Sequence, residues 1–129
     1  MVGQDHALTK TSKLAAASGS STTLARISSS NLLWSFPQMI AHHTITGCNL
    51  GVGDLLGSGT ISGPEKGTQG SLLEATEGGK KPLQLPGSSE TRTFLEDGDE
   101  VTIVGWAGDE ESGYVGFGEC RGTILPALS

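Results

Sequence analysis

The stretch Glu100–Trp106, EVTIVGW, decides the fold class of this sequence. β-branched residues, which favour strands, recur along it, and successive side chains of an extended chain point to opposite faces. One face carries Val101, Ile103 and Gly105, and the other carries Thr102, Val104 and Trp106. The preceding Asp97-Gly98-Asp99 is typical of a turn. The stretch therefore predicts a strand that is entered through a tight turn.

Short strands separated by turns are expected in the rest of the chain after Gly47. Glycine makes up 20 of the 129 residues, about twice its usual usage of roughly 7%. Glycine and proline recur too often here to leave an uninterrupted helix. The further candidate strands are Leu55–Ser58, Ser71–Thr76, Arg92–Leu95 and Tyr114–Leu125, with a hairpin tip at Pro86–Ser89. With only 35% hydrophobic residues, we predict mostly antiparallel β-structure around a modest core.

One helix is predicted between Ser28 and Thr46. An apolar stripe at helical spacing comprises Leu33, Phe36, Met39 and Ile40. Proline is tolerated in the first turn of a helix but not inside it, so Ser35 is the expected N-cap and Pro37 a first-turn residue. The helix should run to about His43, and Gly47 supplies a left-handed stop.

Two adjacent histidines, His42 and His43, fall near the end of this predicted helix. A positive imidazole suits the negative end of the helix dipole. Neighbouring residues on a helix point to different faces, so they do not form the i, i+4 pair of a two-histidine metal site. We predict that both histidines are structural.

The first thirty residues differ in composition from the rest. They are dominated by Ser, Thr, Ala and Gly, and they contain three basic residues but a single acid, Asp5. A mitochondrial transit peptide needs an Arg-rich amphipathic helix, whereas only Arg26 is present. We therefore predict that residues 1–29 form a flexible or edge segment, and that residues 30–129 form one folded unit.

Charge and cysteine usage exclude several classes of protein. The net charge of −6 and the pI near 4.9 argue against nucleic-acid binding, which relies on clustered Lys and Arg. No run approaches the roughly 18 to 20 apolar residues of a membrane-spanning helix. Cys48 and Cys120 lie far apart and form no metal or redox motif. We expect two reduced thiols in a cytoplasmic protein, although a disulfide remains possible.

Several specific strings go further than composition. They are His42-His43-Thr44, Gly47-Cys48-Asn49-Leu50, Gly53-Asp54-Leu55-Leu56, Ser58-Gly59-Thr60-Ile61-Ser62-Gly63, Gly70-Ser71-Leu72-Leu73-Glu74, Phe94–Val101 and Gly113-Tyr114-Val115-Gly116-Phe117-Gly118. In their order and spacing they resemble the carboxy-terminal part of the fumarylacetoacetase family. The resemblance covers Ser30 to Leu128 and implies a β-rich α+β fold, a mixed or antiparallel sheet roll with one main helix.

The resemblance also implies a chemistry. The family hydrolyses fumarylacetoacetate to fumarate and acetoacetate in tyrosine catabolism, with a divalent metal, Mg or Ca, that binds the diketone oxygens. A His activates water, a Glu orients that His, and Lys, Arg and Gln side chains stabilise the developing carbanion. By resemblance, Glu74 matches the Glu that orients the His, and Gly59 and Thr60 match the Gly-Thr substrate contact.

The rest of that apparatus is missing from this sequence. The metal ligands, the catalytic His and the Lys and Arg groups lie upstream in the family, so no residue is predicted as a metal ligand and no tight metal binding is expected. His6 beside Asp5 is a chance pair, because nothing around it matches the family. Asp97–Glu100 lacks the spacing of a calcium loop, and Gly57–Gly63 is not a dinucleotide motif, because no helix follows it.

Three functions remain open. The first is hydrolysis of a small diketo acid in an assembly that supplies the missing residues. The second is a non-catalytic binding or dimerisation module that keeps a pocket near Thr60 and Glu74. The third is a different catalyst on the truncated fold. We predict a truncated C–C bond hydrolase that is inactive alone, forms a homodimer or self-associates, and binds neither nucleic acid nor membrane.

Overall fold

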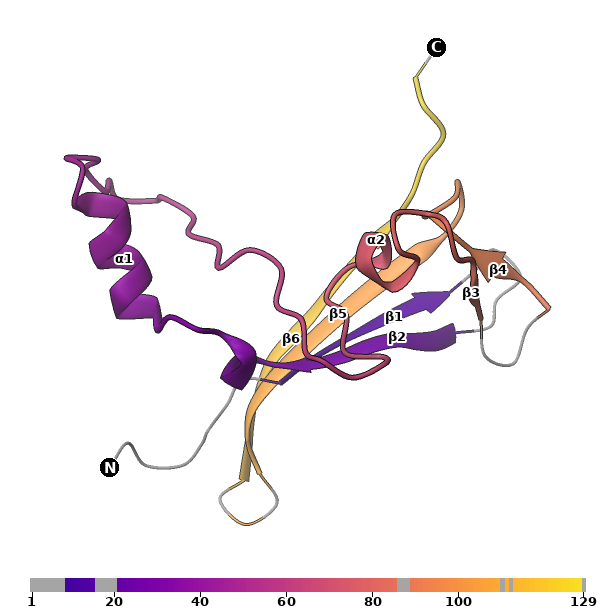
Figure 1. Ribbon diagram of the computed structural model, residues 1–129, viewed down its shortest axis with the longest axis horizontal. Coiled ribbons are helices and arrows are strands. Elements are labelled where there is room, and N and C mark those ends of the chain that lie inside the picture. The colour runs from indigo at the N-terminus through magenta and orange to yellow at the C-terminus, as the bar shows by residue number, and fades with distance from the viewer. Residues whose placement is uncertain (1–8, 16–20, 86–88, 110, 112, 129) are drawn as a thin grey trace.

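The computed structural model describes residues 9–15, 21–85, 89–109, 111 and 113–128. Its centre is a four-stranded antiparallel sheet with the order β2-β1-β5-β6 (Figure 1). The strands are β1 (Thr9–Ala15), β2 (Ser21–Ser28), β5 (Glu100–Asp109) and β6 (Gly113–Thr123). The predicted mostly-β fold with one main helix is confirmed.

Strand β5 contains the stretch that predicted the fold class. It pairs with β1 on one side and with β6 on the other, and a bulge interrupts the β6 ladder between Val104 and Trp106. Val101 packs against the buried Leu14 and Leu85. The turn before β5 is also confirmed, because the Asp99 amide donates to the Glu96 carbonyl at 3.0 Å.

The first thirty residues contribute more structure than their composition predicted. β2 occupies an edge, but β1 lies inside the sheet between β2 and β5, so a flexible or edge segment is the wrong description of residues 9–15. Thr22, Ala25 and Ile27 of β2 are buried, because small and β-branched side chains fit a pleated surface. Residues 1–8 and 16–20, including Asp5 and His6, lie outside the described residues.

A second, two-stranded sheet consists of β3 (Leu83–Gln84) and β4 (Thr91–Arg92), which pair antiparallel. The predicted strand at 92–95 is therefore wrong beyond its first residue. The predicted hairpin tip falls largely on residues 86–88, which lie outside the described residues. Leu85 follows β3 and is buried against Leu14 of β1, so the small sheet is joined to the large one through the core.

The predicted helix is confirmed as α1 (Phe36–Thr44). Ser35 is the N-cap and forms a capping box with Gln38, while Pro37 lies in the first turn. Such a box provides hydrogen-bond acceptors for two backbone amides that have no partner within the helix. Gly47 has the left-handed φ of 85° that a stop requires. A 3₁₀ turn, η1 (Ser29–Asn31), leads from β2 towards this helix.

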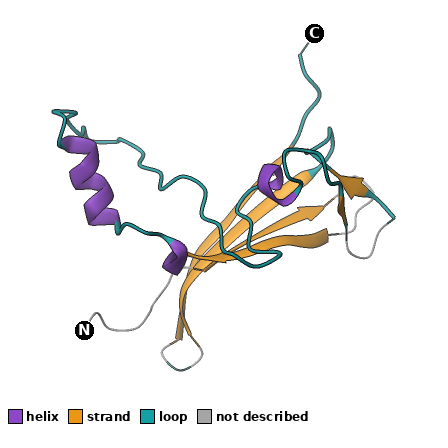
Figure 2. Cartoon of the chain, viewed as in Figure 1, coloured by secondary structure: helices purple, strands orange, loops and turns teal. Residues whose placement is uncertain are grey.

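Two of the predicted strands are not strands. Leu55–Ser58 has no regular structure, and the segment that joins α1 to α2 is a long loop (Figure 2). Ser71–Thr76 contains instead the short helix α2 (Leu72–Ala75). Ser71 caps this helix by accepting a hydrogen bond from the Glu74 amide. An apolar run of this length fits a strand or a helical turn equally well, and the serine cap decides between them.

The core is small, as predicted. Among the described residues the buried hydrophobic side chains are Leu14, Ala25, Ile27 and Leu85. Helix α1 and its flanking loop stand away from the sheet (Figure 1), and large apolar side chains there are exposed, including Val52 and Leu55. No helix in the described part of the chain is long and apolar enough to cross a membrane.

Candidate functional site

Glu74 lies on the helical turn α2, not on the strand that was predicted to carry it. Its backbone amide donates to Ser71 Oγ at 3.2 Å. Its carboxylate accepts a hydrogen bond from Ser62 Oγ at 2.5 Å and a longer one from Ser71 Oγ at 3.4 Å, both on Oε2. The carboxylate is solvent-exposed, but these two hydroxyls fix one of its oxygens.

The Gly-Thr segment predicted to contact substrate lies against the segment that precedes Glu74. Gly70 has no room for a side chain, because a Cβ there would overlap the Ile61 carbonyl and come within 2.6 Å of the Thr60 methyl. The Gly70 amide also donates to Ser62 Oγ at 3.0 Å. The structure therefore brings the segment that contains Thr60 and the segment that contains Glu74 together.

Gly59 and Thr60 are both exposed. Gly59 has a φ of 76°, a left-handed conformation that a side chain disfavours. Ser58 Oγ donates to the Gly59 carbonyl at 3.0 Å. Thr60 therefore follows a left-handed turn and faces solvent.

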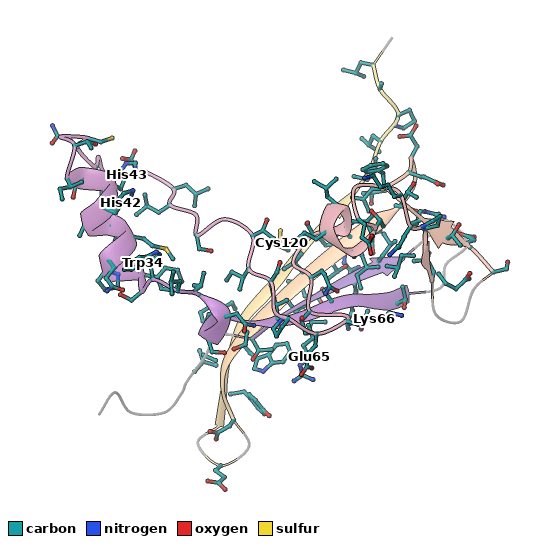
Figure 3. The ribbon with its side chains drawn as sticks, in the orientation of Figure 1. Trp34, His42, His43, Glu65, Lys66 and Cys120 are labelled. Atoms are coloured by element: carbon teal, nitrogen blue, oxygen red, sulfur yellow. The ribbon has the colours of Figure 1, made fainter. Side chains whose placement is uncertain are left out.

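An open pocket adjoins Glu74. Its volume is about 740 Å³, and its lining includes Glu74, Gln69, Lys66 and Lys81. Lys81 Nζ pairs with Glu77 Oε1 at 2.6 Å. Backbone bonds hold the loop that forms one wall, since the Arg26 amide of β2 donates to the Gly67 carbonyl at 3.0 Å. Figure 3 shows Lys66 and Glu65 in this loop near the edge of the sheet.

The histidines of α1 are remote from this pocket. Figure 3 shows His42 and His43 on α1, which stands well apart from α2. His43 Nε2 lies 3.3 Å from the Sγ of Cys48, and both Cys48 and Cys120 are free and exposed. Both histidines therefore lie far from α2, the short helix that contains Glu74.

The described residues do not fit the divalent metal that the family resemblance implies. No group of three or more His, Cys, Asp or Glu side chains in the described ranges is arranged to hold a metal ion. A hard cation such as Mg²⁺ or Ca²⁺ needs several oxygen ligands around one point. Asp97, in the stretch that lacks the spacing of a calcium loop, lies in an exposed turn.

Sequence reasoning missed the two serines at this site. Ser71 could have been found, because Ser71-x-x-Glu74 has the spacing of a capping box and predicts a helix start. Ser62 could not have been found by spacing, because it lies twelve residues from Glu74 and the contact depends on the fold. The site thus combines a predicted acid with an unpredicted hydroxyl partner.

Sequence comparison defines the class of protein to which this fold and site belong. Residues 5–125 match the family model described as fumarylacetoacetate (FAA) hydrolase C-terminal. The chain belongs to the fumarylacetoacetate hydrolase family. The match includes β1 and β2, so the family resemblance extends further towards the amino terminus than the residue strings suggested.

Individual relatives are fumarylacetoacetases. The chain is 65% identical over 112 residues to the Aspergillus fumigatus enzyme, which covers 87% of this chain and 25% of that protein. It is 55% identical over 98 residues to the Caenorhabditis elegans enzyme, with 75% and 22% covered. It is 49% identical over 107 residues to the human enzyme, with 82% and 25% covered. The chain therefore spans about a quarter of the length of these relatives.

Proposed function

We propose that this chain supplies one side of a fumarylacetoacetase active site, in an assembly that also contains the remainder of a family enzyme. In that assembly, hydrolysis of a carbon–carbon bond converts fumarylacetoacetate, a small diketo acid, to fumarate and acetoacetate in tyrosine catabolism. Family membership and the fumarylacetoacetase relatives support the reaction. The observation that carries the site is the Glu74 carboxylate, which is held beside the Thr60 segment.

Glu74 would act by orienting a histidine. A carboxylate that accepts a hydrogen bond from one imidazole nitrogen fixes the tautomer of the ring and stabilises its protonated form. The other nitrogen can then take a proton from the attacking water. Among the residues that the structure describes, the histidines are His42 and His43, and both lie on α1, apart from α2. The proposal therefore takes the oriented histidine from the remainder of the assembly.

Thr60 would bind the substrate. Its hydroxyl can donate a hydrogen bond to a substrate carboxylate, and the left-handed turn at Gly59 leaves the backbone next to it open. The family's enzymes in general use a metal, but the described residues form no donor group for one. No step assigned to this chain therefore involves a metal ion.

A chimera tests this proposal. In it, the chain replaces the matching quarter of the Aspergillus fumigatus enzyme, and hydrolysis is followed by the loss of substrate absorbance. The chimera should be active, whereas the isolated chain should show no hydrolysis. Chimeras that fold but do not hydrolyse fumarylacetoacetate would contradict the proposed function.

The exposed apolar surface favours a second function, a binding or dimerisation module. Leu33, Val52 and Leu55 are 85%, 111% and 98% exposed, and association with a partner would remove such apolar side chains from water. Every described residue of the edge strand β6 is exposed, and an unpaired edge invites further strand pairing. Self-association measured by sedimentation tests this function.

A cytoplasmic location remains part of the proposal, because free cysteines are typical of a reducing compartment.

A further inference from the structure

The two carboxylate oxygens of Glu74 have different surroundings. Oε2 accepts hydrogen bonds from Ser62 Oγ at 2.5 Å and from Ser71 Oγ at 3.4 Å. Within the part of the chain that the structure describes, no hydrogen bond falls on Oε1. One oxygen is therefore held by this chain, and the other is left open to a hydrogen bond from an imidazole on this exposed side chain.

Ser62 is itself oriented. The Gly70 amide donates to Ser62 Oγ at 3.0 Å and so occupies one of the lone pairs of that oxygen. A hydroxyl has a single proton, and here the proton is directed at Glu74. The short O–H···O distance is typical of a hydrogen bond to an ionised carboxylate. Ser62 is half-buried, whereas the Glu74 side chain that accepts its hydrogen bond is exposed.

Ser71 plays a different part. Its Oγ accepts from the Glu74 amide at 3.2 Å as the N-cap of α2, and its contact with the carboxylate is long. Loss of the Ser71 hydroxyl should weaken the helical turn. Loss of the Ser62 hydroxyl should free the carboxylate and leave the turn intact.

We propose that Ser62 is a positioning residue for Glu74. By holding Oε2, it fixes the rotation of the carboxylate so that Oε1 faces the histidine that the assembly supplies. This role rests on the proposed function. In this role Ser62 acts only through Glu74.

The contact can be tested in the isolated chain without any catalysis. The chain is labelled with glutamate that carries ¹³C in its side-chain carboxyl, and the Glu74 resonance is assigned by its loss in Glu74→Gln. Ser62→Ala should shift this resonance, whereas Ser62→Thr, which keeps the hydroxyl, should restore it. Ser21→Ala, at the exposed start of β2, is the matched control and should leave it unchanged. An unchanged resonance in Ser62→Ala would overturn the contact.

The role in catalysis is tested in the chimera. Ser62→Ala should lower kcat roughly tenfold or more, the size expected for the loss of a hydrogen bond to a charged group, with KM nearly unchanged. Ser62→Thr should recover most of kcat, which a purely structural role would not predict if both variants are equally stable. Equal kcat in Ser62→Ala and wild type would refute the positioning role. An inactive wild-type chimera would instead reject the proposed function, and the NMR experiment would still decide the contact.

Discussion

Arg92 and Asp99 form a two-pronged ion pair in the interior of the described chain. Nε and Nη2 of Arg92 donate to the two carboxylate oxygens of Asp99, both at 3.0 Å, and their side chains are 8% and 1% exposed. Planar guanidinium and carboxylate groups match in this geometry. The pair joins β4 to the turn before β5, so it fixes the small sheet relative to the large one.

Removing one partner should destabilise the fold strongly. Arg92→Ala leaves the Asp99 carboxylate buried without its cation, and such changes cost about 3 to 5 kcal/mol. Arg92→Lys keeps the charge but loses the two-pronged geometry, so its cost should be smaller than that of Arg92→Ala. Urea denaturation followed by circular dichroism would measure both. An Arg92→Ala variant as stable as wild type would show that the pair is not structurally important.

The same pair predicts a loss of stability in acid. Burial acts to raise the pKa of Asp99, but hydrogen bonds from Arg92 and from the Glu96 amide outweigh it and hold the pKa below its ordinary value of 3.8. The unfolded chain therefore binds this proton more readily than the folded chain does. The stabilisation is fully present above the ordinary value and is lost as the pH falls from there through the lowered pKa.

Denaturation midpoints across the acid range would check this prediction. Asp99→Asn cannot titrate at this position, so its stability should change less than that of wild type below the ordinary pKa. If the stability of the two proteins falls in parallel as the pH is lowered, other carboxylates cause the loss of stability in acid.

The elements that could be predicted from the sequence are those whose signals are local. Ser35, Pro37 and Gly47 mark the start and the end of α1 within a few residues of it, and the caps act through neighbouring backbone groups. The side chains of Glu100–Trp106 alternate between two faces, and the stretch has a length that fits only a strand. In both cases the energetic preference is contained in the segment itself.

The elements that could not be predicted depend on distant partners. β1 and β2 are rich in small polar residues, and β1 forms because β5, some ninety residues away, pairs with it in the register Leu14↔Val101. Tertiary pairing of this kind overrides weak strand propensity. The contact between Ser62 and Glu74 could not be predicted either, because it also depends on the fold. At the site, the family resemblance predicts the acid, but only the fold identifies the hydroxyl that holds it.

The isolated chain should bind divalent metal weakly. A tight site needs three or more converging donors, and no such group occurs in the described residues. Calorimetric titration of Mg²⁺ or Ca²⁺ into the chain should give no stoichiometric site, whereas the chimera, which adds the rest of a family enzyme, should give one. A tight site in the isolated chain would contradict this expectation.

The isolated chain should self-associate through its exposed apolar loop and strand edge. Apolar surface left in water favours association, which removes that surface from solvent. Sedimentation velocity should therefore give a mass above that of the monomer, which falls on dilution. Val52→Asp with Leu55→Asp should shift the distribution towards monomer, and Ser21→Asp with Thr23→Asp, which adds the same charge on β2, should shift it less. A monodisperse monomer at high concentration would contradict the prediction.

Glu74 and Thr60 should affect different kinetic constants of the chimera. Glu74→Gln keeps the shape of the side chain but removes the charge that stabilises a protonated histidine. It should therefore lower kcat by about a hundredfold or more, the range of general base catalysis, with little change in KM. Thr60→Val deletes a substrate hydrogen bond and should act largely through binding, at a cost of about 1 to 3 kcal/mol in kcat/KM. Steady-state kinetics separates the two effects, because a ground-state contact changes KM whereas an interaction made in the transition state changes kcat. If Glu74→Gln leaves kcat within a few-fold of wild type, Glu74 does not orient the base, and the role inferred from the family resemblance is wrong.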